Sequence, residues 1–363
     1  MNWCFVYQNY VTGGLETFVL RMANYLVNNG HYVYIACQSV SQDMKSQYID
    51  SGATIEYFDV WNRKKIANRL KNKADIFISF GLSDYFFIGK FAKHSLSLMY
   101  CVHPTHLTMD DRKMNLIEIL KKPVFYQIIK KGISKNTLLM MDENISDAIY
   151  KKYKLKVKPS EILQLPYESA SKVKQWNENS ERPHSVLTIC RADFPFKSYV
   201  LGLIDAIASI NINSIEMELT IVSYGKDLDI IKRKIEGKKY IKLIQETKYN
   251  DLEKLYLNSD IYVGMGSTVI EASNYGLPVI LANVNNEKFV SCGYFYENPT
   301  QKGIFNHDAK PGISYLNELV DYNYSQLKEM GKKNKCAFHE LYDIKSFEQS
   351  IMRIYHEMCL YEY

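Results

Sequence analysis

The chain has 363 residues, more than one hydrophobic core usually organises, so two domains are expected. With 47% hydrophobic and 23% charged residues, its composition is that of a folded globular protein and excludes disordered and collagen-like classes. The net charge of +5 conceals a basic first half: residues 1–160 contain 22 Lys and Arg against 13 Asp and Glu, whereas residues 161–363 contain 23 against 27.

Short apolar runs alternate with segments of helical periodicity along the whole chain. In the first half the predicted strands are Trp3–Tyr7, Tyr32–Cys37, Thr54–Phe58, Asp75–Ser79, Leu96–Cys101 and Thr137–Met141. In the second half they are Ser185–Cys190, Glu218–Val222, Tyr240–Ile244, Asp260–Val263 and Pro278–Ala282. Continuous apolar strands that alternate with helices indicate an α/β protein with two parallel sheets, each covered by helices on both faces.

A polar stretch without periodicity separates the two sets of strands. We expect an N-terminal Rossmann-like domain over residues 1–168, a linker over 169–184 and a C-terminal Rossmann-like domain over 185–345. A last helical segment, 346–363, is expected to pack back toward the N-terminal domain. Ligands of such folds bind beyond the carboxyl ends of the strands, so functional residues are sought just after each strand.

The cysteines and the start of the chain indicate a cytoplasmic protein. The longest apolar runs are too short to span a bilayer, and no basic stretch precedes the first apolar residues. Seven cysteines occur without Cys-x-x-Cys spacing, and four of them lie in predicted strands: Cys4, Cys37, Cys101 and Cys190. We expect buried, reduced thiols rather than disulfides or a zinc site.

The loop after the first predicted strand contains two adjacent glycines, Gly13 and Gly14, followed by Glu16. It lacks the Gly-x-Gly-x-x-Gly spacing of a dinucleotide site. Two glycines at the start of a helix let backbone amides approach an anion, and the helix dipole favours that charge. The alternative is a tight turn in which Glu16 compensates the dipole, and both interpretations stay open at this point.

Two cations follow the first predicted strand of the second half. Arg191 stands at its carboxyl end, and Lys197 stands where the next helix is expected to start. A lysine at a helix N-terminus is electrostatically unfavourable unless an anion compensates it. The pair is therefore predicted to clamp a pyrophosphate, with solvated surface charges as the alternative.

The stretch Gly264-Met-Gly-Ser-Thr-Val-Ile-Glu271 is predicted to be a glycine loop that leads into a short helix. The amides of Ser267 and Thr268 are expected to bind a phosphate, and the carboxylate of Glu271 is expected to accept hydrogen bonds from two ribose hydroxyls. The alternative for Glu271 is a capping box, in which its carboxylate folds back onto the amide of Thr268.

Taken together, four motifs resemble the retaining GT-B glycosyltransferases of the group 1, family 4 type. They are Gly13-Gly14-Leu-Glu16, the segment Arg191–Lys197, Val222-Ser-Tyr-Gly225, and Gly264–Glu271 with the following Gly276-Leu-Pro278-Val. Their order and spacing fit nearly the whole chain. The resemblance implies two Rossmann-like domains that face each other across a cleft, and a nucleotide-diphosphate sugar as co-substrate, with no metal and no other cofactor.

The resemblance also implies roles for individual residues. Arg191 and Lys197 would hold the departing diphosphate, and Glu271 the ribose of the nucleotide. The family usually has another glutamate, separated from this one by seven residues, that contacts the donor sugar; here that position is Val263. The implied donor-binding set is Gly13, Gly14, Arg191, Lys197, Gly266, Ser267, Thr268 and Glu271.

A histidine is expected to contact the sugar or the acceptor just after the strand predicted at Leu96–Cys101. His103 is the better match to the family, and it is assigned a catalytic role beside Arg191 and Lys197. His106 lies close enough to compete for this assignment. Because lone histidines are often structural, a structural role for His103 is the alternative.

Basic and large apolar residues mix in Asp111–Lys131, and Asn62–Lys65 adds positive charge. A basic face flanked by aromatic residues can rest on an anionic membrane leaflet. The alternative is a core-facing helix whose lysines are solvated. No nucleic-acid-binding module is recognisable, so no nucleic-acid partner is expected.

The sequence thus predicts a cytoplasmic hexosyltransferase, peripheral on the inner membrane face. It would move a sugar from a nucleotide-diphosphate sugar, expected to be a UDP-sugar, to a glycan or lipid-linked acceptor in surface polysaccharide biosynthesis. The reaction would retain configuration and need no metal. Two alternatives stay open: a sugar-nucleotide epimerase of the same fold, and a catalytically silent GT-B subunit that assists a partner, which would explain Val263.

Overall fold

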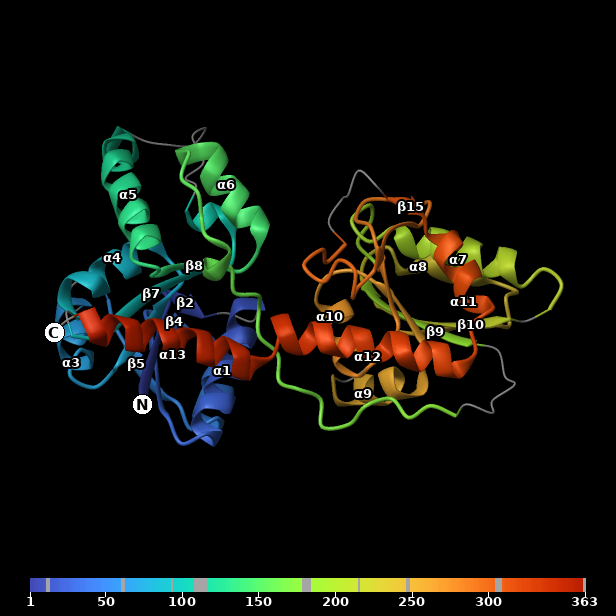
Figure 1. Cartoon of the computed structure of the whole chain (residues 1–363), viewed down its shortest axis with the longest axis horizontal. Coiled ribbons are helices and arrows are strands. Elements are labelled where there is room, and N and C mark those ends of the chain that lie inside the picture. The colour runs from blue at the N-terminus through green and yellow to red at the C-terminus, as the bar shows by residue number, and fades with distance from the viewer. Residues whose placement is uncertain are drawn as a thin grey trace. The chain divides into compact units, whose positions relative to one another are not determined.

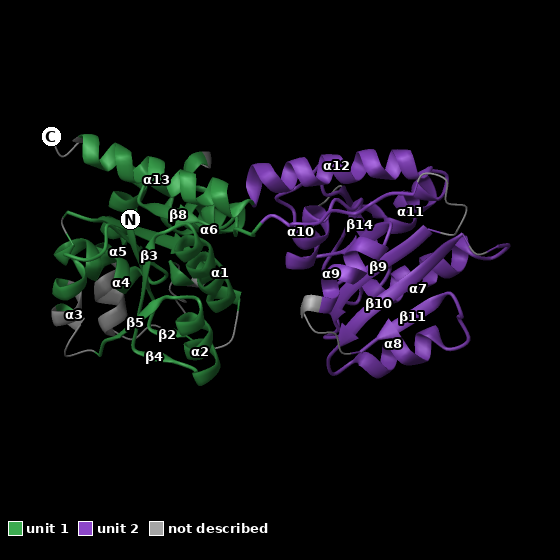
Figure 2. Ribbon diagram, turned by 90° about the horizontal axis from the view of Figure 1, so that it is seen from below, with its two compact units in different colours: residues 1–168, 343–363 green, residues 169–342 purple. Residues whose placement is uncertain are grey.

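The computed structural model describes residues 1–10, 14–59, 63–92, 94–107, 116–177, 184–214, 216–245, 249–303 and 309–361. The chain divides into two compact units, coloured separately in Figure 2. Unit 1 comprises residues 1–168 and 343–363, and unit 2 comprises residues 169–342.

Unit 1 contains a six-stranded sheet in the order β5-β3-β1-β6-β7-β8, and all its neighbouring strands are parallel. Its strands are β1 (Asn2–Val6), β3 (Tyr32–Cys37), β5 (Thr54–Tyr57), β6 (Ile76–Ser79), β7 (Leu96–Cys101) and β8 (Leu138–Met140), and β2 (Asn9–Tyr10) pairs separately with β4 (Ser39–Val40). Its helices are α1 (Gly14–Asn28), α2 (Gln42–Asp50), α3 (Arg63–Leu70), α4 (Leu82–Phe91), α5 (Leu116–Ser134), α6 (Glu143–Tyr153) and α13 (Ile344–Tyr361), with 3₁₀ turns η1 (Pro104–His106) and η3 (Pro159–Glu161).

Unit 2 contains a seven-stranded sheet in the order β11-β10-β9-β12-β13-β14-β15. Its strands are β9 (His184–Arg191), β10 (Met217–Tyr224), β11 (Ile241–Ile244), β12 (Ile261–Gly264), β13 (Val279–Ala282), β14 (Val290–Tyr294) and β15 (Lys310–Pro311). Helices α7 (Tyr199–Ile210), α8 (Leu228–Ile235) and α11 (Gly312–Val320) cover one face, and α9 (Tyr249–Asn258), α10 (Ser267–Asn274) and α12 (Tyr324–Leu341) cover the other (Figure 1).

All eleven predicted strands are present, and both sheets place their first strand in the middle, as Rossmann-like folds do. The α/β class with two Rossmann-like domains is therefore confirmed. Among the residues that the structure describes, no helix combines the length and the apolar character needed to cross a membrane.

The expectation of purely parallel sheets is wrong at one edge of unit 2. β14 pairs antiparallel with β13, and β15 pairs antiparallel with β14. Antiparallel neighbours need no crossover helix, so the strand–helix alternation on which the prediction rested is missing there. β14 also contains Gly293, and β15 has two residues, so neither has the long apolar run of a buried parallel strand.

Alternate residues of β1 show how the sheet of unit 1 is covered on both faces. Trp3 and Phe5 pack in one core cluster, together with apolar residues of α1, α2 and α13. Cys4 and Val6 point to the opposite face and pack with residues of α3 and α4. Burial of both faces explains why the strand sequence is apolar at every position.

The four cysteines predicted in strands lie in β1, β3, β7 and β9, and all four are buried free thiols. Burial raises the pKa of the Cys37 thiol to about 11 and that of Cys101 to about 12. These thiols are protonated at neutral pH and are poor nucleophiles.

The segment expected as a linker belongs to unit 2 as far as the structure describes it, up to residue 177. The amide of Ala170 donates to Asn274 Oδ1 at 2.9 Å, and the amide of Lys174 donates to the carbonyl of Tyr275 at 2.9 Å. At the other end, α13 belongs to unit 1, where Glu348 accepts a hydrogen bond from the Tyr25 hydroxyl at 2.9 Å.

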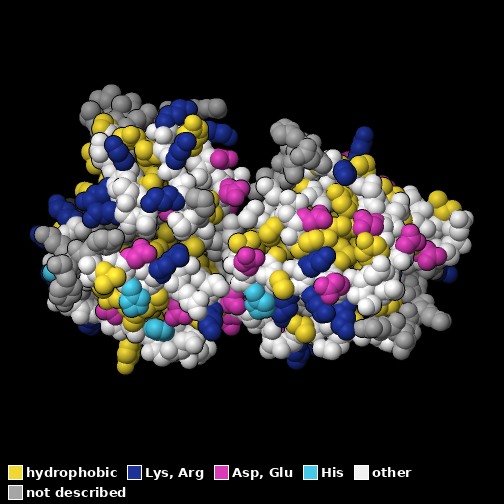
Figure 3. Space-filling model, in the orientation of Figure 1, with side chains coloured by type: hydrophobic (Ala, Val, Ile, Leu, Met, Phe, Trp, Pro, Cys, Tyr) yellow, Lys and Arg dark blue, Asp and Glu magenta, His cyan; other side chains and the backbone are white. Residues whose placement is uncertain are grey.

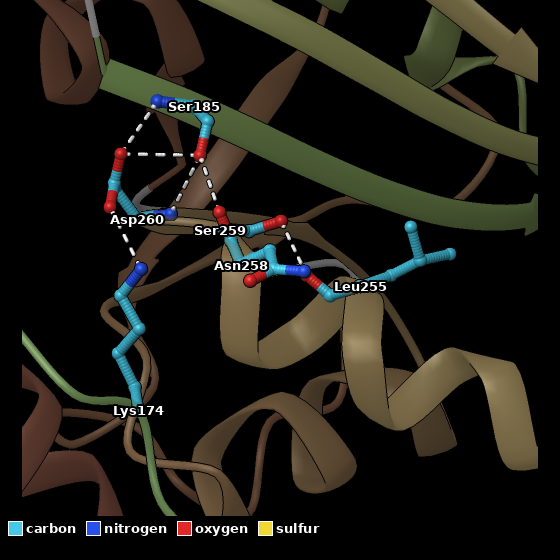
Figure 4. A network of polar contacts seen from close by, with 6 residues as sticks. All are labelled: Lys174, Ser185, Leu255, Asn258, Ser259 and Asp260. Carbon is cyan, nitrogen blue, oxygen red and sulfur yellow. Dashed lines mark hydrogen bonds and ion pairs between the residues drawn. The ribbon is translucent and has the colours of Figure 1, made fainter. Parts of the chain in front are cut away.

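A buried carboxylate joins this segment to the centre of the unit 2 sheet (Figure 4). Asp260, just before β12, has no exposed surface. It accepts from the Lys174 ammonium at 3.0 Å, from the Ser185 amide at 2.9 Å and from the Ser185 hydroxyl at 3.2 Å. Its own amide donates to the Ser185 carbonyl at 2.8 Å, so β9 and β12 are fixed side by side at their amino ends.

Replacing Lys174 with Met is expected to lower the free energy of unfolding by about 3 kcal/mol, because Asp260 would keep a buried charge without its cation. The control is Lys172→Met, since Lys172 is 67% exposed in its ion pair with Glu253 and is expected to cost less than about 1 kcal/mol. Urea unfolding measures both. Equally small losses would show that the buried ion pair contributes no stability.

Candidate functional site

The strand order of unit 2 brings two predicted motifs to one point. β9 lies between β10 and β12, and the chain winds outward from β9 in opposite directions, which makes the carboxyl ends of β9 and β12 a topological switch point. Open α/β sheets bind ligands at this point. Arg191 is the last residue of β9, and the loop that begins at Gly264 leaves β12.

Arg191 ends β9 and Lys197 follows the strand, and the predicted position of Lys197 needs a correction. The helix α7 begins at Tyr199 with Ser198 as its N-cap, so Lys197 precedes the helix instead of opening it. The Arg191 side chain is 59% exposed, and its Nε lies 2.5 Å from Asp193 Oδ2. Burial, together with the positive charge of Arg191, lowers the pKa of Lys197 below its ordinary value.

The charge of Arg191 is balanced in part by the carboxylate of Asp193. Like charges close together disfavour the protonated form of Lys197, and a bound phosphate would reverse that effect. Lys197 is half-buried, which distinguishes it from a fully solvated surface charge, whereas Arg191 is exposed and paired with Asp193.

The motif that ends in Gly225 has a structural explanation. Gly225 has a φ of +125°, and a Cβ there would lie 2.8 Å from the carbonyl oxygen of Ala192. Only glycine permits this approach without displacing the backbone. Asp227 completes the contact, because its carboxylate accepts from the amide of Phe194 at 2.7 Å. The loop after β10 thus holds the loop with the two cations in place.

The glycine loop after β12 leads into α10 as predicted, but the backbone amide of the N-cap residue already has a hydrogen-bond partner. Gly266 is the N-cap with a φ of +77°, and its amide donates to the carbonyl of Lys302 at 2.8 Å. The first amides inside the helix are those of Ser267, which is exposed, and Thr268, which is half-buried. An anion at the start of α10 would therefore be held by these two amides rather than by that of Gly266.

The capping-box alternative for Glu271 is wrong because Thr268 is not the N-cap of α10. Thr268 stands inside the first turn, and its hydroxyl donates to the carbonyl of Met265 at 3.2 Å. Glu271 accepts instead from the hydroxyl of Tyr256 in α9, at 3.1 Å. Tyr256 is buried, and its ring stacks on that of Tyr275 with centroids 5.1 Å apart, so the hydroxyl has a fixed position.

Val263, at the position where the glycosyltransferases that the sequence resembles usually have their other glutamate, lies in the hydrophobic core of unit 2. It is the third residue of β12, with no exposed surface, and packs among apolar side chains. A carboxylate at this point would be buried without compensation. The position is therefore part of the core in this chain.

Two residues that the sequence did not single out belong to this edge. In the sequence, Tyr256 lies at helical spacing from apolar residues, which is the pattern of an ordinary core residue. Only its hydrogen bond to Glu271 in the structure indicates another role. Asn283 directly follows β13, and its buried side-chain amide has no hydrogen-bond partner in the described part of the chain. The sequence signal that could have identified Asn283 is its position directly after a strand, where ligand-binding residues of such folds are expected.

In unit 1 the first glycine loop is described only in part. Gly13 lies outside the described residues, and Gly14 is the first residue of α1. A Cβ at Gly14 would meet no atom within 4 Å, so packing against the rest of the chain does not require glycine there. Glu16 is buried in the first turn of α1.

Both histidine candidates follow β7, but their environments differ. His103 is exposed, and its carbonyl accepts from the Cys101 thiol at 3.2 Å. His106 is half-buried, with its ring centroid 6.2 Å from that of His103. Burial, and then the charge of His103, lower the pKa of His106. Of the two, His103 is the more accessible to a ligand.

The basic segments are only partly described. Residues 111–115 and Asn62 lie outside the described residues, and the helix that follows, α5, contains Pro123 and has exposed lysines at positions 130 and 131. Among the described residues, no three His, Cys, Asp or Glu side chains are grouped so that they could hold a metal ion.

A comparison with protein families finds a match within unit 2. Residues 173–294 match the family model of glycosyl transferases group 1, which covers both loops at the β9–β12 switch point. No curated protein matches the chain significantly.

Solved structures share the fold over nearly the whole chain at low identity. A glycosyltransferase from Rickettsia africae is 14% identical, with a TM-score of 0.66 over 99% of this chain and 98% of that one. HepE of Anabaena, solved with UDP, is 11% identical, with a TM-score of 0.65 over 97% and 99%. WaaG, a glycosyltransferase involved in lipopolysaccharide biosynthesis, is 16% identical, with a TM-score of 0.53 over 93% and 95%.

The strand order and these comparisons lead to one conclusion: the chain has the two-domain GT-B fold, and its residues 173–294 are similar to glycosyl transferases of group 1.

Proposed function

We propose that the protein transfers a sugar from a nucleotide-diphosphate sugar, bound on unit 2, to a glycan or lipid-linked acceptor. The observation that carries this proposal is the meeting of two anion-binding features at the β9–β12 switch point. Arg191 and Lys197 lie on one side, and the amino end of α10 with Glu271 lies on the other. UDP is the nucleotide we assign, supported by the UDP complex of the HepE structure.

In the proposed reaction the bond between the sugar and the β-phosphate breaks, and negative charge builds on the departing diphosphate. Arg191 and Lys197 would stabilise that charge, the task that a metal ion performs in other transferases. The amides of Ser267 and Thr268 would bind a phosphate at the amino end of α10. We propose that the reaction is metal-independent and retains the configuration of the sugar.

Glu271 is proposed to accept hydrogen bonds from the two ribose hydroxyls. Its Oε2 accepts from the hydroxyl of the buried Tyr256 at 3.1 Å, and this hydrogen bond orients the carboxylate. With Val263 in the core, the contact to the donor sugar must come from other residues at this edge, and Asn283 is one candidate.

The acceptor is proposed to bind unit 1, where His103 would contact the sugar or the acceptor. The basic first half of the chain favours an acceptor or a surface that carries negative charge. A peripheral position on the inner membrane face, in the assembly of a surface polysaccharide, would bring the enzyme to lipid-linked acceptors. The role of WaaG in lipopolysaccharide biosynthesis supports this setting.

Incubation with a panel of nucleotide sugars, with and without a lipid extract, tests the proposal. We expect nucleotide release that rises when the extract supplies an acceptor. An epimerase would instead convert the nucleotide sugar without any acceptor. A catalytically silent subunit would bind the nucleotide sugar without cleaving it, so no nucleotide would be released. Either result would contradict the proposal.

Replacing Arg191 or Lys197 with Ala is expected to lower turnover about 100- to 1,000-fold, because each stabilises charge that develops in the transition state. The double variant should lose less than the product of the two losses, since both act on one group. Nucleotide-release kinetics and melting temperatures measure the four proteins. Lys232→Ala, which removes an exposed cation from α8, is the control and should keep full turnover. Near-normal turnover in both single variants would place the diphosphate elsewhere.

UDP affinity is expected to decline as the pH rises, and to do so at a lower pH than it would if Lys197 had the pKa of an ordinary lysine. Protonated Lys197 attracts the diphosphate and neutral Lys197 does not, so binding is strongest below its lowered pKa and weakens as the pH rises through it. Lys197→Arg should remove this decline, because a guanidinium stays charged. Calorimetric titration with UDP across neutral and alkaline pH measures both. The same decline in wild type and variant would assign the titration to another group.

Glu271→Gln is expected to weaken UDP binding by about 1.5 to 3 kcal/mol, because a charge-assisted hydrogen bond becomes a neutral one. The loss should be smaller with 2′-deoxy-UDP, which lacks one of the hydroxyls. Tyr256→Phe should cause a smaller loss in the same direction, since the carboxylate keeps its charge but loses its orienting partner. A lowered melting temperature with unchanged UDP affinity would make Glu271 a structural residue.

A further inference from the structure

A groove of about 1000 Å³ lies in unit 1, and none of the described residues assigned above to donor binding or catalysis lines it. Its walls come from α4, α5 and the end of α13, and its floor comes from the first residues of β7 and the segment that enters β8. β7 begins in this groove at Leu96 and ends at Cys101, just before His103. The groove therefore lies at the amino edge of the sheet, opposite the edge at which His103 stands.

The walls of the groove are mainly apolar. Phe86 of α4 and Val124 of α5 stand 49% and 50% exposed, although both are large apolar side chains. Exposed apolar side chains at one groove favour a ligand with an apolar part of its own. The apolar side chains of the three helices that line it are Phe86, Val124, Ile128, Ile354 and Met358.

Three lysines add positive charge to the same groove: Lys90 at the end of α4, Lys131 in α5 and Lys135 just after α5. All three are exposed, and none forms an ion pair with a described residue. Glu357 is the one carboxylate among the described residues that line the groove. Figure 3 shows Lys and Arg side chains next to apolar ones over the part of unit 1 where Figure 1 places α4 and α5.

The floor is polar and has room for a ligand. The hydroxyls of Tyr85 and Thr137 lie 2.7 Å apart and satisfy each other, whereas the buried hydroxyl of Ser97 has no partner among the described residues. Above it, Gly89 leaves space in α4, where a Cβ would stand 3.8 Å from Ser97 Oγ. A larger side chain at position 89 would point into the groove toward Ser97.

We propose that this groove binds one anionic membrane lipid, with its acyl chain along the apolar helix faces and its phosphate at the lysines. A fully apolar ligand would leave the lysines unused, and a small anion would leave the apolar walls uncovered. The exposed rim at Phe86 and Val124 lets the rest of the lipid remain in the bilayer. The proposal extends the membrane association under the proposed function and does not depend on donor binding.

Calorimetry with short-chain phosphatidylglycerol below its micelle concentration tests the site, with short-chain phosphatidylcholine and glycerol phosphate as reference ligands. Wild type is expected to bind phosphatidylglycerol and to bind both references more weakly. Equal binding of phosphatidylcholine would overturn the role of the lysines. Equal binding of glycerol phosphate would overturn the role of the apolar walls.

Two variants at one position test the place of binding. Gly89→Leu should abolish phosphatidylglycerol binding by filling the groove, whereas Gly89→Ala should keep most of it. Neither change should lower the melting temperature, because Ala and Leu favour a helix more than Gly does. Unchanged binding by a stably folded Gly89→Leu protein would show that the lipid binds elsewhere.

Two double variants that remove the same charge distinguish lipid binding in the groove from diffuse electrostatic attraction to the membrane. Lys131→Gln with Lys135→Gln should weaken binding to vesicles of phosphatidylglycerol and phosphatidylcholine, by about fivefold for each lysine removed. Lys151→Gln with Lys156→Gln removes the same charge from exposed positions of unit 1 outside the groove and should have a much smaller effect. Equal losses in the two pairs would overturn the groove. UDP titration of all variants should stay unchanged, so a failure of the donor site is detected separately.

Discussion

The buried carboxylate of Asp260 is the constraint on which the architecture of unit 2 depends. It joins the amino ends of β9 and β12 through Ser185 and holds the segment that enters unit 2 through Lys174. An uncompensated charge at this depth is costly, so the two strands keep one register. Their carboxyl ends are fixed by the same register. The two cations after β9 and the glycine loop after β12 are therefore held on neighbouring strands.

Chain topology then explains why residues distant in sequence form one candidate site. In both units the chain starts in the middle of the sheet and winds outward first to one side and then to the other. Open α/β sheets bind ligands where the loops beside such a switch point leave the sheet. Single residues fix the loops themselves. Gly225 lets the loop after β10 pack against the backbone of Ala192, and Tyr256 orients Glu271.

The sequence was sufficient for the strands of the two large sheets and for the fold, because both depend on local patterns. Apolar runs bounded by polar residues located every parallel strand of the two large sheets, but not the short parallel pair β2 and β4. The spacing of glycines, cations and Glu271 indicated the GT-B fold. The sequence was insufficient where contacts between residues far apart in the chain determine the local structure. The antiparallel edge strands, the N-cap at Gly266 and the burial of Val263 all depend on neighbours from other elements. The lysines and apolar residues of the groove come from α4, from α5 and the residue after it, and from α13, and only those of α5 belong to a segment that the sequence singled out for membrane contact.

The central claim is that the β9–β12 edge of unit 2 binds the diphosphate of a nucleotide sugar. A crystal structure of the protein soaked with UDP tests it most directly, because it locates the phosphates and the ribose at once. The account predicts the diphosphate within hydrogen-bond distance of Arg191, Lys197 and the first amides of α10, with the ribose hydroxyls on Glu271. A nucleotide bound to unit 1, or to unit 2 away from these four contacts, would contradict it.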